Sequence, residues 1–140
     1  MRPSEVYEIE ICCRDIACGT RGMVEWEWDS KFRTIQTRIG KQEEEKMFAL
    51  LKETFQSNWN YKIIKKAPES ITKIVDTLGG LKEGQYLFFS DPELDIMIYA
   101  AWWPWAAREW FSIRLGLIVE NISDEEYIEL RRLFQTWFEQ

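Results

Sequence analysis

The sequence predicts an α+β domain in which helices pack on one face of an antiparallel β-sheet, and three observations lead to this class. Several segments alternate apolar and polar residues with a period of two, as half-buried strands do. Other segments repeat apolar residues at helical spacing. Strands come in runs that end in a helix, which is typical of α+β folds and not of parallel α/β sheets. With 140 residues, we expect a single domain over 1–140.

The first forty residues are predicted to form three strands. Residues 4–13 alternate, which places Tyr7, Ile9, Ile11 and Cys13 on one face. Residues 14–22 follow as a loop that contains two glycines. Residues 23–28 and 33–39 then form a hairpin around a four-residue turn, which would pair Trp26 with Ile35 and keep the apolar face in register.

The middle of the chain is predicted to hold two helices and a short strand. Residues 41–57 carry apolar residues at helical spacing, and glutamates in the first turns favour the positive end of the helix dipole. Residues 59–65 are assigned to a short strand. Pro68 suits the start of a second helix over 69–78, which Gly79 and Gly80 end.

The last third repeats the pattern of three strands and a helix. Strands are predicted over residues 85–89, 94–101 and 110–120, and a capping box at Ser123 and Glu126 begins a helix that runs to about residue 139. The predicted order is therefore βββα, then a short strand and a helix, then βββα. Because the two βββα halves have the same order of elements, a pseudo-duplicated topology is an alternative.

A tryptophan-rich stretch lies between the last two predicted strands. Trp102, Trp103, Pro104 and Trp105 follow one another, and proline donates no backbone hydrogen bond, so we expect the strand to stop here. Adjacent side chains of a strand point to opposite faces, so at least one of these rings should be partly exposed. Exposed tryptophan is typical of binding hot spots, whereas the alternative is that all three rings cover the end of the sheet.

The charge of the chain restricts its partners. The net charge is −6, and residues 91–140 alone account for it, with four basic and ten acidic side chains. An acidic surface repels phosphate backbones and anionic lipid, so neither nucleic acid nor a membrane surface is an expected partner. A basic protein or a cationic ligand fits better, and a homo-oligomer remains open.

The cysteines and the absent histidines limit the chemistry. Three cysteines within residues 12–18 do not make a disulfide framework, which indicates a reducing cytoplasm, and we expect the thiols to bind no metal. The chain contains no histidine, so a Ser-His-Asp or Cys-His site cannot be built from it. Nucleotide-binding glycine loops are also missing. We therefore expect no catalytic residues and no cofactor.

Two acidic segments are candidate binding elements. Asp91, Glu93 and Asp95 alternate in a turn, where they form a solvated hairpin loop or, as the alternative, supply oxygen ligands to a cation. Asp124 and Glu125 stand at a helix start, which favours acidic residues in any case, and they also extend the acidic surface.

These observations favour a small acidic protein-binding module of the inhibitor, immunity-protein or adaptor type. Its predicted binding residues are Trp102, Trp103, Trp105, Asp91, Glu93, Asp95, Asp124 and Glu125. The first alternative is a small-ligand-binding or sensor domain with a tryptophan-rich pocket. The second alternative is an enzyme that uses carboxylates alone.

Overall fold

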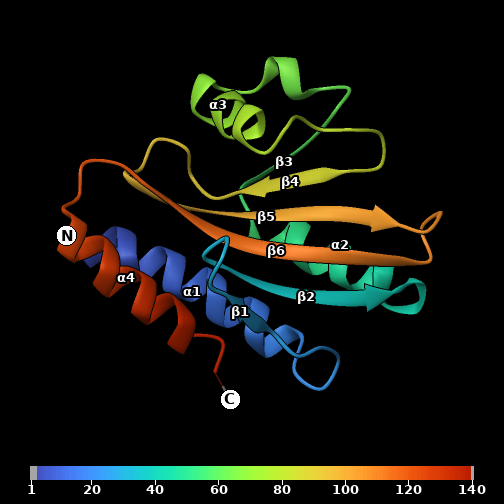
Figure 1. Cartoon of the computed structure of the whole chain (residues 1–140), viewed down its shortest axis with the longest axis horizontal. Helices are drawn as coiled ribbons and strands as arrows, with labels where there is room; N and C mark the ends of the chain where they lie inside the picture. The colour runs from blue at the N-terminus through green and yellow to red at the C-terminus, as the bar shows by residue number, and fades with distance from the viewer. Residues whose placement is uncertain (1–2, 140) are drawn as a thin grey trace.

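A computed structural model describes residues 3–139, and within them one six-stranded antiparallel sheet lies between helices (Figure 1). The strands are β1 (Glu27–Asp29), β2 (Thr34–Gly40), β3 (Ser57–Asn60), β4 (Tyr86–Phe89), β5 (Ile96–Trp105) and β6 (Trp110–Val119), in the spatial order β1-β2-β6-β5-β4-β3. The helices are α1 (Pro3–Gly19), α2 (Glu44–Thr54), α3 (Glu69–Thr77) and α4 (Asp124–Thr136), with 3₁₀ turns η1 (Lys41–Glu43) and η2 (Ile64–Lys66). The α+β class predicted from the sequence is confirmed.

The two faces of the sheet are covered unequally. Helices α1, α2 and α4 bury the main core, in which Ile9, Met47 and Phe134 pack with the inward side chains of the strands. Helix α3 packs on the opposite face, where Ile71 and Val75 form a smaller core with side chains of β4 and β5. The expectation that the helices pack on one face therefore holds for three of them. Figure 1 shows α3 apart from the other helices, beyond β3 and β4.

The first element is a helix, so the strand predicted over residues 4–13 is wrong, and of the loop predicted over residues 14–22 only residues 20–22 lie outside the helix. The buried residues of α1 are Glu5, Ile9, Cys13 and Ile16, whose spacing of four, four and three is helical. Two residues of the predicted strand face, Tyr7 and Ile11, are exposed instead. The alternation is therefore a coincidence within a helical pattern, and the predicted order of elements fails at its first position.

The first hairpin forms, but its first strand is only Glu27–Asp29 instead of residues 23–28, and its register differs from the predicted one. Trp28, not Trp26, pairs with Ile35. The cause is Asp29, whose carboxylate accepts hydrogen bonds from the backbone N–H groups of Lys31 and Phe32 at 2.9 and 3.3 Å, so the turn starts one residue later than predicted. The register changes by two residues, which leaves the same side chains on the core face.

Strand β5 does not stop at the tryptophan-rich stretch. It continues through Pro104 to Trp105, which pairs with Trp110 of β6. On its other side, β5 pairs with β4 only as far as Trp102, opposite Tyr86. Pro104 therefore lies where β5 has become an edge strand on that side, and the missing N–H of proline is tolerated at an edge.

Strand β6 and helix α4 contribute side chains to the same core. Phe111, Ile113 and Leu115 are fully buried, and Leu130 and Phe134 of α4 belong to the same core. Helix α4 begins with the predicted capping box, in which Ser123 and Glu126 exchange side-chain and backbone hydrogen bonds. Within residues 3–139 no helix is long and apolar enough to cross a bilayer.

The three cysteines lie on α1 and differ in accessibility, which gives a testable prediction. Burial raises the pKa of Cys12 to about 12 and that of the fully buried Cys13 well above its usual range, whereas Cys18 is exposed. The thiolate is the reactive form. In a thiol-titration assay with Ellman's reagent at pH 8, we expect one fast-reacting thiol in the native protein and three in denaturant. A Cys18→Ser variant should lose the fast phase; a fast phase that persists in it would contradict the prediction.

Candidate functional site

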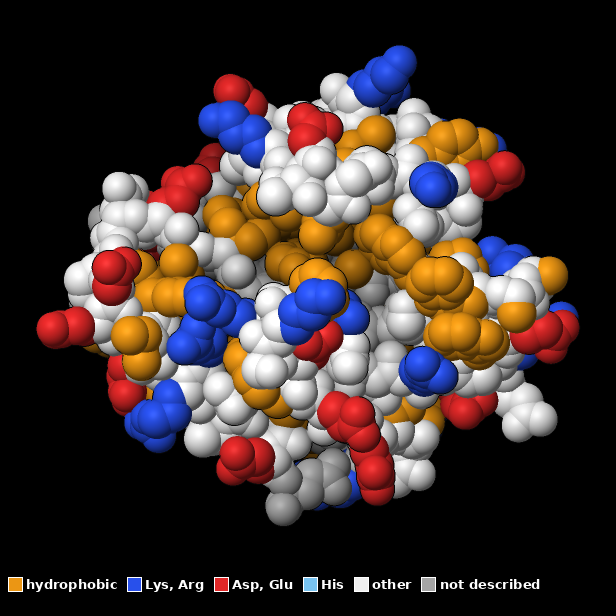
Figure 2. Space-filling view, in the orientation of Figure 1, with side chains coloured by type: hydrophobic (Ala, Val, Ile, Leu, Met, Phe, Trp, Pro, Cys, Tyr) orange, Lys and Arg blue, Asp and Glu red, His pale blue; other side chains and the backbone are white. Residues whose placement is uncertain are grey.

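A groove runs across the face of the sheet that α3 leaves partly uncovered. It consists of two adjoining hollows, of about 360 and about 710 Å³, which share Trp105, Ser112 and Arg114. We call the smaller hollow the aromatic groove; it is lined by Phe32, Thr34, Leu78, Tyr99, Ala101, Trp103, Trp105, Ser112 and Arg114. Figure 2 shows an apolar band below α3 that extends toward the end of the β5–β6 hairpin.

The floor of the aromatic groove follows from the alternation of β5 and β6. Tyr99, Ala101 and Trp103 point to this face, whereas Ala100 and Trp102 between them point to the main core. Tyr99 is paired with Gly116 of β6. A Cβ atom at Gly116 would lie 2.5 Å from atoms of the Tyr99 ring, so the missing side chain lets the ring lie flat over β6.

Replacing Gly116 with valine should therefore distort the groove floor. Tyr99 is buried, so its ring has little room to move away from a new side chain, and overpacking of this kind costs about 1–3 kcal/mol. Urea unfolding monitored by circular dichroism measures the loss. Ser112→Ala is the control, because it changes a neighbouring position without added bulk. Gly79→Val is not suitable as a control, because Gly79 has a φ of 88°. Unchanged stability of Gly116→Val would show that the Tyr99 ring adapts freely.

Arg114 is the charged centre of the aromatic groove. Its guanidinium donates hydrogen bonds to the Asp29 carboxylate at 2.8 Å and to the Thr34 hydroxyl at 2.6 Å, and it lies 5.0 Å from the centre of the Phe32 ring. Because Asp29 also holds the β1–β2 turn, this one side chain ties the groove floor to the turn that carries Phe32. The hydrogen bond from Arg114 is the main reason why the pKa of Asp29 is lowered.

The lowered pKa of Asp29 predicts a pH dependence of stability. A carboxyl whose pKa is lower in the folded than in the unfolded state stabilises the fold above its unfolded pKa, and this contribution is lost as the pH falls through the folded pKa. An Asp29→Asn variant should be less stable than the parent at pH 7, and the two proteins should approach each other in stability below about pH 4. Melting temperatures measured between pH 2 and 8 test this. A stability difference that is constant across this range would contradict it.

The walls of the aromatic groove are unusually apolar for a surface. Phe32, Leu78 and Trp105 are 59%, 38% and 47% exposed, and they come from the β1–β2 turn, the end of α3 and the end of β5. Three segments that are far apart in the sequence thus bring exposed apolar side chains to one hollow. Exposed apolar side chains that gather around a concave surface mark binding sites, whereas single ones are ordinary.

Trp105 is held in place by its neighbours at the end of the hairpin. Its ring stacks on Trp110 with centroids 5.6 Å apart, and its indole N–H donates to the Ser112 hydroxyl at 2.9 Å. Arg38 lies over the Trp110 ring at 4.7 Å. The hairpin turn is tied to α2 through an ion pair between Arg108 and Glu44. The exposed ring is therefore presented by a fixed support, which lowers the entropy cost of binding.

The structure separates the residues that the sequence predicts to bind together. Trp102 is only 1% exposed and belongs to the main core, whereas Trp103 and Trp105 line the aromatic groove. The predicted acidic residues lie at the opposite end of β5: Asp91, Glu93 and Asp95 in the turn before it, and Asp124 and Glu125 at the start of α4. Asn121 donates to Asp95 at 3.1 Å and so links the two acidic segments.

Several groove residues were not predicted from the sequence, namely Phe32, Leu78, Tyr99 and Arg114. Arg114 did carry a signal, because it is the one charged residue of β6. Within residues 3–139 no group of three or more cysteine or acidic side chains is placed to hold a metal ion. In comparisons with known proteins, no family model, curated protein or solved structure matches the chain.

Proposed function

We propose that this chain is a protein-binding module, of the inhibitor, immunity-protein or adaptor kind, and that its recognition surface is the aromatic groove. The observation that carries the proposal is the convergence of Phe32, Leu78 and Trp105 around one concave surface. Exposed aromatic anchors next to an arginine have the composition of interface hot spots. The groove would receive an apolar side chain of the partner between these three residues.

The charge of the molecule supports a basic partner. The predicted acidic residues lie before β5 and at the start of α4. At about 3.3 Å per strand residue, Asp95 lies roughly 13 Å along the strand from Tyr99 of the groove and roughly 33 Å from Trp105. At these distances they act on the rate of encounter rather than through contacts, and salt weakens the effect. We further propose a cytoplasmic location, which the three unpaired thiols support.

The proposal is tested by affinity capture with variants of the groove. Immobilised parent protein is compared with Phe32→Ala and Trp105→Ala for capture of proteins from the native host lysate, and the affinity of the captured protein is then measured. Loss of a hot-spot residue costs at least about 2 kcal/mol, so each variant should bind about thirtyfold more weakly or worse. Tyr7→Ala is the matched control, because Tyr7 is 60% exposed and lies on α1, outside the groove. Equal capture by all four proteins would contradict the proposal.

One observation favours a small-molecule ligand as the second candidate. The aromatic groove has a volume of about 360 Å³, within the range of ligand pockets, and it combines apolar walls with the polar groups of Ser112 and Arg114. Native mass spectrometry of the freshly purified protein separates the candidates. A stoichiometric small molecule that is absent from Trp103→Ala would favour the ligand, and an unliganded chain would favour the protein partner.

A further inference from the structure

A second hollow, on the other side of the chain segment that leads into β1, combines aromatic rings with acidic side chains. It has a volume of about 530 Å³. Trp26, Trp28 and Phe138 line it, and Ile35, which is 2% exposed, forms its apolar floor. We call this hollow the acidic pocket. It shares Glu25 and Glu27 with the larger of the two hollows on the sheet face. It shares no residue with the aromatic groove.

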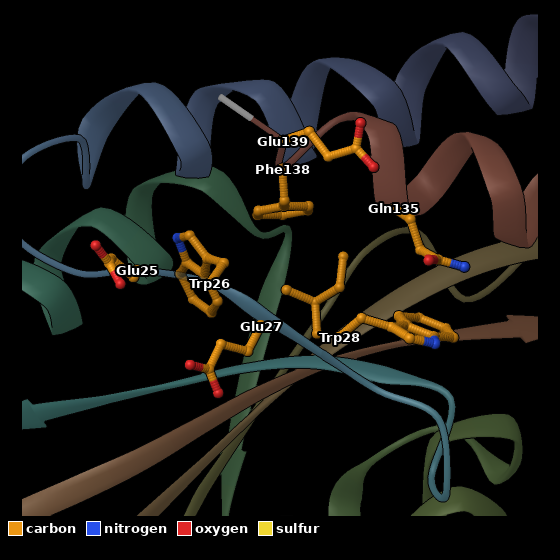
Figure 3. A pocket seen from close by; sticks show the side chains of 8 residues that line it. Glu25, Trp26, Glu27, Trp28, Gln135, Phe138 and Glu139 are labelled. Atoms are coloured by element: carbon orange, nitrogen blue, oxygen red, sulfur yellow. The ribbon is translucent and has the colours of Figure 1, made fainter.

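The rings of the acidic pocket are held in place by contacts with neighbouring side chains. Trp26 and Trp28 both pack against the main core. Trp26 meets Phe138 edge to face at 5.4 Å, and its indole N–H donates to the Thr20 hydroxyl at 2.9 Å. Trp28 packs edge to face on Phe134 at 6.4 Å. Figure 3 shows the rings of Trp26 and Trp28 on either side of the hollow, with Phe138 above them.

The charged side chains that line the acidic pocket are all carboxylates. Glu25, Glu27 and Glu139 line it, and the remaining polar residue is the neutral Gln135. Figure 3 shows Glu25 to the left of Trp26, Glu27 below Trp26 and Glu139 above Phe138. Positive charges line the two neighbouring hollows: Arg38 and Arg114 lie in the larger sheet hollow, which Glu25 and Glu27 also line, and Arg33 and Arg131 lie in a smaller hollow beyond Trp28. Within the acidic pocket itself, the lining charges are all negative.

From this arrangement we propose that the acidic pocket binds an organic cation, an alkylated ammonium or a guanidinium group. The faces of indole rings attract cations, and this attraction is strongest for tryptophan. Carboxylates at the rim add a long-range attraction and reject anions. A hard metal ion is not the expected ligand, because among residues 3–139 the carboxylates of the pocket form no group placed to hold one. The proposal does not depend on the function proposed for the aromatic groove.

The two sources of such a cation are a free small molecule and a basic side chain of a protein, and paired probes distinguish them. Choline is compared with its uncharged isostere 3,3-dimethylbutan-1-ol, and N-acetylarginine amide with N-acetylcitrulline amide. Binding is followed by NMR through the indole N–H signals of Trp26 and Trp28. We expect saturable shifts with millimolar Kd for at least one cation and none for its neutral isostere. Choline as the tighter ligand indicates a free quaternary ammonium, and the arginine derivative indicates a protein side chain.

Charge-matched variants decide whether the cation binds in the acidic pocket. The triple variant Glu25→Gln, Glu27→Gln, Glu139→Gln should bind the cation at least about tenfold more weakly. The control triple variant Glu8→Gln, Glu45→Gln, Glu83→Gln removes the same charge from exposed positions elsewhere and should bind as the parent does. Phe32→Ala should also leave cation binding unchanged, which separates this test from that of the aromatic groove. Equal weakening in both triple variants, equal shifts with the neutral isosteres, or no shift with any probe would overturn the proposal.

Discussion

Replacing Trp102 with alanine is expected to lower the free energy of unfolding by about 3–5 kcal/mol, the range for removing a buried aromatic ring. The ring is 1% exposed and lies in the main core. It meets Phe48 edge to face at 5.2 Å and Phe111 at 4.9 Å, so its removal takes away contacts with both α2 and β6. Urea unfolding followed by far-ultraviolet circular dichroism gives the value.

The neighbouring tryptophans supply the control for this experiment. Trp105 is three residues further along the same strand but is 47% exposed, so Trp105→Ala should cost far less than Trp102→Ala. In binding experiments the order should reverse, because only Trp105 is accessible to a partner. Equal loss of stability in both variants would mean that the hairpin end belongs to the core, and the groove would then lose one of its walls.

Leu115→Ala is expected to lower the free energy of unfolding by about 2–5 kcal/mol, because the Leu115 side chain is fully buried in the middle of the sheet. Leu115 lies in β6 between its partners Ile35 of β2 and Ala100 of β5, so the change leaves a cavity where two halves of the sheet join. The same denaturation experiment measures it. Ile128→Ala, at a position of α4 that is 57% exposed, should change stability by less than about 0.5 kcal/mol. A loss below about 1 kcal/mol for Leu115→Ala would show that the core face of β6 is assigned wrongly.

The sequence was most informative where a repeat was long and had clear ends. The alternation of β6 extends over ten residues, and the helix that follows has a capping box, so both elements were predicted correctly. Residues 4–13 show the opposite case. Their apolar residues fit a period of two, but the buried set Ile9, Cys13 and Ile16 becomes recognisable as helical only when residues beyond 13 are included.

The candidate site was predicted only in part, because it depends on distances between elements. The period of β5 decides which tryptophans share a face, but it does not say which face the larger set of helices covers. The aromatic groove exists because α3 packs on the second face and brings Leu78 near residues 32 and 105. No local pattern in the sequence carries that information. The pair of Arg114 and Asp29, 85 positions apart, has the same origin.

The position of β6 between β2 and β5 has a consequence for how the chain folds. The hairpins β1–β2 and β5–β6 close over short loops, but Gly40 pairs with Trp110 and Thr34 with Gly116, separations of 70 and 82 residues. Closing such long loops is entropically costly and slows folding. During synthesis from the N-terminus, β2 has no strand on that side until β6 has left the ribosome. For most of translation, its apolar residues Ile35 and Ile39 and its open edge therefore need protection from other chains.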